Sequence, residues 1–120
     1  MLEHYLSEVK RVLGERGRLH ATFFLLNSER ERRFRDSDAE LANALMSSDD
    51  PARSPTEIPE WMVAYEEDWL RALFDDVGLK LRLINYGSWP EWALGLEQVM
   101  APQDTIVAYA SDMAARSRGA

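Results

Sequence analysis

The sequence Arg-Leu-His-Ala-Thr-Phe-Phe-Leu-Leu-Asn at positions 18–27 decides the fold. Large apolar side chains occupy both alternating sets of positions, because Phe23 belongs to one set and Phe24 to the other. A strand with one face in water would alternate apolar and polar residues instead. The stretch therefore predicts a central strand of a parallel sheet that helices cover on both faces.

Helical periodicity lies on both sides of this strand in the sequence. Apolar residues recur every three or four positions over residues 2–13, and Gly14 follows. The same spacing occurs over residues 66–77, and Gly78 follows. Each pattern gives one apolar stripe, and glycine is common just after the end of a helix. We expect one helix in each segment.

Two more strands are expected, at residues 79–86 and 105–110. The strands at 18–27 and 79–86 enclose a helical crossover, which predicts that they are parallel. We expect no crossover helix in the connection over residues 87–103. The last two strands should therefore form an antiparallel hairpin.

Residues 28–64 are predicted to form a long polar insert or lid. We expect one short helix in it, through Leu41 to Met46, begun by a capping box of Ser37 and Glu40. The run Arg-Glu-Arg-Arg-Phe-Arg at 30–35 is interpreted as a solvated loop of mixed charge. A phosphate contact is the alternative interpretation of this run, if it faces a cleft.

Together these segments predict an α/β fold. We expect a partial Rossmann-like three-layer unit with about three strands and two main helices. The first two strands should be parallel and the last antiparallel. This unit would cover residues 1–110 as one domain, and residues 111–120 would be a flexible tail.

Composition excludes several classes of function. The 120 residues carry a formal charge of −7, which argues against a nucleic-acid partner. The absence of cysteine excludes disulfides and thiolate metal sites. The sequence begins without a signal-peptide pattern and contains no apolar run long enough to span a membrane. We expect a cytoplasmic protein with no metal and no membrane partner.

Six stretches of the chain resemble the class I S-adenosylmethionine-dependent methyltransferases. Residues 4–13 with 17–19 resemble the helix and turn before the family's fifth strand, and residues 21–27 resemble that strand in one bacterial branch. The sequence Phe-Asp-Asp-Val-Gly-Leu at 74–79 is similar to the junction of the next helix with the sixth strand. The sequences Gly-Ser-Trp at 87–89 and Gln-Asp-Thr-Ile-Val at 103–107 resemble the terminal hairpin.

The resemblance implies the C-terminal half of such an enzyme. The family's glycine-rich cofactor turn, acidic residue and third-strand loop would precede Met1, and no G-x-G-x-G pattern occurs in these residues. We therefore predict no catalytic or cofactor-binding residue here. The complete enzyme would use S-adenosylmethionine, whereas this chain alone would bind none and be inactive. The expected partner is a complementing N-terminal half or a second copy.

Four residues are candidates for contact with a methyl acceptor: Asn27, Phe24, Tyr86 and Trp89. Asn27 would stand where the fifth strand opens into the cleft, and its alternative role is to end the strand. Phe24 is alternatively a core residue, and Tyr86 and Trp89 are alternatively a local packing cluster. The alternative function for the whole chain is a non-catalytic remnant that acts as a binding or dimerisation module.

Overall fold

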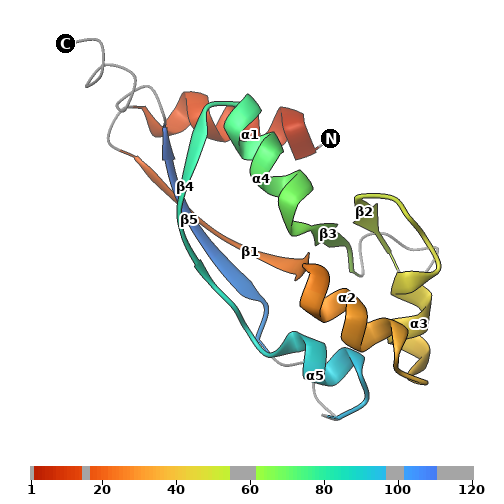
Figure 1. Ribbon diagram of the computed structural model, residues 1–120. Coiled ribbons are helices and arrows are strands. Elements are labelled where there is room, and N and C mark those ends of the chain that lie inside the picture. The colour runs from red at the N-terminus through yellow and green to blue at the C-terminus, as the bar shows by residue number, and fades with distance from the viewer. Residues whose placement is uncertain (1, 15–16, 55–61, 97–101, 111–120) are drawn as a thin grey trace.

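The computed structural model describes residues 2–14, 17–54, 62–96 and 102–110, which form an α/β fold (Figure 1). The described residues contain five helices and five strands, and the strands form one mixed sheet in the order β2-β3-β1-β5-β4. In chain order the elements are α1 (Leu2–Leu13), β1 (Arg18–Leu26), α2 (Ser28–Arg35), α3 (Glu40–Met46), β2 (Ala52–Arg53), β3 (Ala64–Glu66), α4 (Glu67–Asp76), β4 (Leu79–Asn85), α5 (Trp89–Ala93) and β5 (Asp104–Ala110).

The two main helices and three main strands are those that the sequence predicts. Helix α1 ends at a glycine in the left-handed region, since Gly14 has a φ of 66°. Helix α4 ends in a similar way at Asp76, two residues before Gly78, which has a φ of 83°. A side chain would be strained at both positions, so these glycines fix where the helices stop.

The direction of the main strands agrees with the prediction. Strand β5 is antiparallel to β1 on one side and to β4 on the other. Strands β1 and β4 therefore run in the same direction with β5 between them. The expected number of about three strands is wrong, because the short strands β2 and β3 extend the sheet beyond β1.

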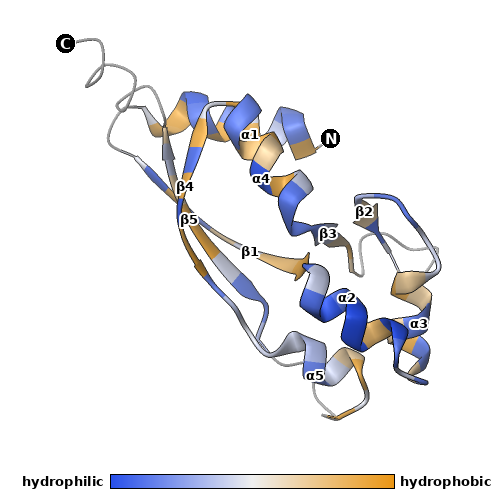
Figure 2. Ribbon diagram, viewed as in Figure 1, coloured by the Kyte–Doolittle hydropathy of each residue, from blue (hydrophilic) through white to orange (hydrophobic). Residues whose placement is uncertain are grey.

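The interpretation of residues 30–35 as a solvated loop is also wrong. They belong to α2, which buries Arg30 and Phe34 although most of the helix is hydrophilic (Figure 2). The connection over residues 87–103 contains no crossover helix in its described part, as expected, but it does contain the short helix α5, which the sequence did not predict.

Helix α3 occurs where it was predicted, but without the capping box. Its N-cap is Ala39, whose backbone N–H donates to the Ser37 hydroxyl at 3.0 Å. Ser37 therefore forms a local turn before the helix and leaves the helix N-terminus without a side-chain cap.

Strand β1 is covered on both faces only at its last three residues. Leu25 belongs to the core cluster beneath α1 and α4, and Phe24 and Leu26 belong to a second cluster with α2, α3 and α5. Nearer the start of the strand, His20 and Thr22 are exposed. The expectation of two covered faces is therefore correct only where the second cluster reaches the sheet.

None of the described helices is long and apolar enough to cross a membrane. Part of the expected insert, residues 55–61, lies outside the described residues, as does the expected tail at 111–120.

Candidate functional site

The carboxyl ends of β1 and β3 meet the N-termini of two helices. Asn27 follows β1 directly, and its side-chain oxygen accepts the backbone N–H of Arg30 at 3.0 Å, which caps α2. Glu66 ends β3 and is the N-cap residue of α4. Ligands of open α/β sheets bind beyond the carboxyl ends of parallel strands, so this region is the candidate site. We call it the strand-end site.

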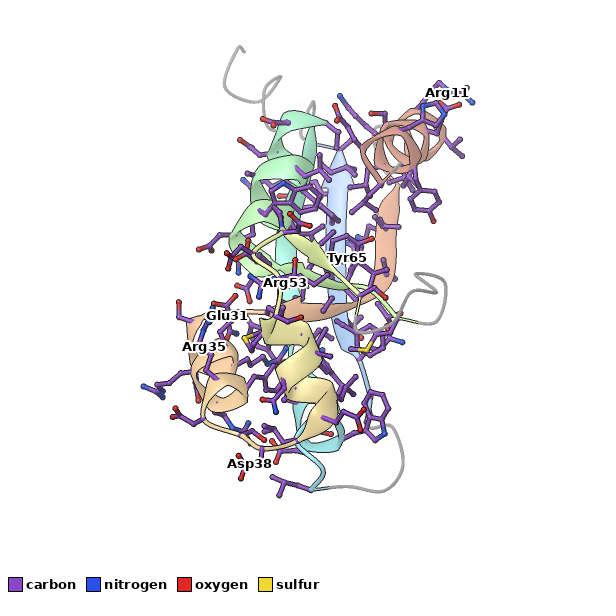
Figure 3. The ribbon with its side chains drawn as sticks, turned by 90° about the vertical axis from the view of Figure 1, so that its right-hand side faces the viewer. Arg11, Glu31, Arg35, Asp38, Arg53 and Tyr65 are labelled. Carbon is purple, nitrogen blue, oxygen red and sulfur yellow. The ribbon has the colours of Figure 1, made fainter. Side chains whose placement is uncertain are left out.

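A cavity of about 210 Å³ opens at the strand-end site. Its lining is Leu26, Asn27, Ser28, Glu31, Glu66, Asp68 and Trp69. The buried Arg53 guanidinium lies 3.5 Å from Glu31 (Figure 3) and 3.1 Å from Glu66, so two of the carboxylates share one cation. The lining contains three carboxylates, of Glu31, Glu66 and Asp68, and only two of them are paired with Arg53. The lining is therefore negative and suits a polar or cationic group better than an anion.

A second cavity, of about 530 Å³, lies on the other side of Asn27. Its lining is Asn27, Glu29, Arg30, Arg33, Tyr86, Gly87, Ser88, Pro90 and Glu91. Opposite charges are already paired here, since Arg33 and Glu91 are 2.9 Å apart. Asn27 borders both cavities and is the residue that joins them.

A buried ion pair forms the back of the second cavity. The two terminal nitrogens of Arg30 donate to the two carboxylate oxygens of Asp104 at 2.7 and 3.0 Å. Asp104 is completely buried, and 8% of Arg30 is exposed. Such a bidentate pair holds both groups in one geometry.

Other donors complete the coordination of Asp104. Its carboxylate accepts the backbone N–H of Leu25 at 2.9 Å, that of Gly87 at 2.8 Å and the indole N–H of Trp89 at 2.9 Å. Arg30 also donates to the carbonyl oxygens of Leu25 and Gly87. The Arg30–Asp104 pair therefore fixes the end of β1, the loop after β4 and the start of β5 together.

The sequence interpretation missed Arg30 and Asp104 as a pair. Arg30 and Phe34 are four residues apart, which puts them on one face of a helix, and this spacing was a signal for a buried face. The neighbouring charges at Glu31, Arg32 and Arg33 favoured the interpretation as a solvated loop instead. The pairing with Asp104 joins residues 74 positions apart, and no local pattern indicates it.

Tyr86 connects the second cavity to α4. Its hydroxyl donates to Glu67 at 2.7 Å, and Arg71 donates to the other oxygen of Glu67 at 3.1 Å. The Tyr86 ring lies 5.1 Å from the guanidinium carbon of Arg30. Burial, followed by the hydrogen bond and charge of Glu67, raises the pKa of Tyr86 above its ordinary value of 10.0.

The four predicted acceptor contacts fall into two groups. Asn27 and Tyr86 line cavities, so a contact with a bound molecule stays a prediction for both. Phe24 and Trp89 are buried and pack edge to face at 5.2 Å. Neither of them is among the residues that line the two cavities described above.

The described residues contain no group of three or more His, Asp or Glu side chains arranged to hold a metal ion. No model of a known protein family matches the chain, and no solved structure matches it either.

Proposed function

We propose that this chain is the C-terminal part of a class I S-adenosylmethionine-dependent methyltransferase. One observation carries the proposal: β1 and β4 are parallel, α4 lies between them in the sequence, and β5 returns antiparallel. The sequence resemblance implies these elements in this order, from the fifth strand to the terminal hairpin. The chain would supply one edge of the sheet and the acceptor side of the pocket.

The unpaired edge of β1 supports the proposal that a neighbouring strand comes from another chain. Strand β3 pairs with β1 only at residues 24–26. Within the described residues, no strand pairs with residues 18–23 on the side away from β5. An unpaired edge beside a buried strand readily accepts another strand. On α1, which covers the β1 side of the sheet in Figure 3, Tyr5 is 58% and Val12 74% exposed.

The strand-end site supports the acceptor role. Methyl transfer needs the nucleophile in line with the sulfonium, and most of the acceleration comes from this positioning. Asn27 and the two cavities beside it lie at the carboxyl end of β1, where an acceptor could be held. The complementing half would bind S-adenosylmethionine, and the residues described above would orient the acceptor.

Calorimetry with S-adenosylmethionine tests the proposal. The titration is made against this chain, against the separately expressed cofactor-binding half of a class I methyltransferase, and against their equimolar mixture. We expect a Kd on the order of micromolar only in the mixture, because each component lacks part of the sheet. Micromolar binding by this chain alone, or no gain in the mixture, would contradict the proposal.

Two matched variants show whether the gain depends on the β1 side of the sheet. Val12→Asp puts a charge on the exposed part of α1, and Leu96→Asp does the same beyond α5, where the side chain is 66% exposed. Val12→Asp should abolish the gain in binding, and Leu96→Asp should leave it unchanged. Equal effects of the two variants would contradict association through α1 and β1.

A second candidate is a non-catalytic dimerisation module, which the same unpaired edge of β1 favours. Sedimentation equilibrium separates the two candidates. A dimer that Val12→Asp dissociates, with no gain in S-adenosylmethionine binding in the mixture, would favour the module. A monomer at high concentration would exclude it.

A further inference from the structure

One face of the three main strands points away from α1 and α4. Its residues form three rows across β1, β5 and β4, because directly paired residues share a face of the sheet. The rows are Arg18, Tyr109 and Lys80, then His20, Val107 and Leu83, then Thr22, Thr105 and Asn85. We call these nine residues the open face.

The open face is largely accessible. Every β1 and β4 residue in it is exposed, and Leu83 is exposed to 50%. The three β5 residues are half-buried between the flanking strands. Helices α1 and α4 both lie on the opposite side of the sheet (Figure 1). Two of the buried residues of β5, Ile106 and Ala108, belong to the core cluster with those helices.

The open face combines an apolar centre with positive charge. Val107 and Leu83 lie in the middle row, and Tyr109 lies between Arg18 and Lys80 in the row at one end. Arg82 is the extra residue at the irregularity in β4, beside this face. The nine residues include no carboxylate, although the chain as a whole has a charge of −7. No carboxylate in the described ranges pairs with Arg18, Lys80 or Arg82.

We propose that the open face binds an amphipathic helix whose apolar stripe is flanked by carboxylates. Three strands spaced about 4.8 Å apart span roughly 10 Å, and a helix with its side chains is about 10–12 Å wide. One helix that lies along the strands is therefore wide enough to cover all three. Carboxylates beside its apolar stripe would meet Arg18, Lys80 and Arg82, and basic flanks would be repelled.

Charge argues against a second copy as the occupant. A symmetric contact between two open faces would bury Arg18, Lys80 and Arg82 of both copies with no carboxylate on either face to pair with them, which is unfavourable. The inference goes beyond the proposed function and does not depend on it, because it uses only the composition and exposure of this face.

Two peptide probes test the inference. Both are amphipathic helices of about 18 residues with one leucine stripe, flanked by glutamate in one peptide and by lysine in the other. Amide NMR shifts map where each binds on the chain, and fluorescence anisotropy gives its Kd. We expect the glutamate peptide to shift His20, Thr22 and Val107, and to bind about tenfold more tightly than the lysine peptide.

Charge-reversed variants make the test specific. Lys80→Glu with Arg82→Glu should reverse the preference for the two peptides. Arg32→Glu with Arg35→Glu makes the same change of charge on exposed positions of α2 and should leave the preference unchanged. Equal binding of both peptides, shifts confined to α1 or α4, or a dimer that Leu83→Asp dissociates would each overturn the inference.

Discussion

At the scale of single residues, Asp104 shows how one buried carboxylate joins distant segments of a chain. Its oxygens accept hydrogen bonds from Arg30, the backbone after β4 and the end of β1. Taking a charge out of water is costly unless its hydrogen-bonding capacity is filled. The pair with Arg30 therefore makes the ends of three strands depend on one another.

Asp104→Asn should be strongly destabilising, because it leaves the buried Arg30 guanidinium without a counter-charge. We expect a loss of about 3–5 kcal/mol in the free energy of unfolding, measured by urea denaturation. Glu8→Gln is the control, since it removes an exposed, solvent-screened pair with Arg11 and should leave the urea midpoint almost unchanged. Similar losses in both variants would contradict the role given to Asp104.

Tyr86 should titrate above its ordinary pKa of 10.0. The difference in phenolate absorbance between the wild type and Tyr86→Phe gives its titration curve. Glu67→Gln should lower this pKa only in part, because burial is the larger cause. Asp68→Asn, which removes an exposed neighbouring carboxylate, should leave the pKa of Tyr86 unchanged.

The raised pKa of Tyr86 also fixes the sign of a stability effect. The folded state favours the neutral phenol. Below the pKa that Tyr86 has in the unfolded chain, its contribution to the free energy of unfolding is therefore present in full. It is lost as the pH rises through the folded pKa. Above pH 10.0 the free energy of unfolding should therefore fall more steeply in the wild type than in Tyr86→Phe. A less steep fall in the wild type would contradict this sign.

At the scale of elements, the start of β5 fits closely against the loop after β4. A Cβ on Gly87 would collide with the carbonyl oxygens of Pro102 and Gln103. Both are backbone atoms, so a side chain there would have to move one chain segment. The backbone of Gly87 also binds Asp104 and Arg30, so such a movement would disturb the buried pair.

Gly87→Ala should therefore cost more than an ordinary glycine substitution. We expect a loss of about 2–3 kcal/mol in the free energy of unfolding. Gly95→Ala is the matched control, because its φ is 77° and nothing lies within 4 Å of a Cβ there. It should cost about 1 kcal/mol. An equal loss at Gly87 and Gly95 would mean that the loop can shift freely.

At the scale of the whole molecule, the sequence predicted the elements that periodicity marks. Helices α1 and α4 have clear apolar stripes ending at glycine, and β1, β4 and β5 have apolar runs long enough to recognise. Among these elements, β1 and β4 run in the same direction and β4 pairs antiparallel with β5, as expected.

The elements that were missed depend on tertiary contacts. Strand β3 has three residues and forms only where β1 provides a pairing edge. Helix α2 buries just two side chains among its charges, and α5 is held by Trp89, which donates to Asp104. The predicted site was correspondingly incomplete. Asn27 lies at the strand-end site, but no local sequence pattern indicates the Arg30–Asp104 ion pair behind it.

Hydrogen–deuterium exchange on β1 is the most direct test of the claim that its edge receives a strand from a complementing half. Exchange is compared for the chain alone and for its mixture with the cofactor-binding half of a class I methyltransferase. We predict new protection at amides within residues 18–23 and no change in β4, which forms the opposite edge. Protection of β4 instead, or unchanged exchange in β1, would contradict the claim.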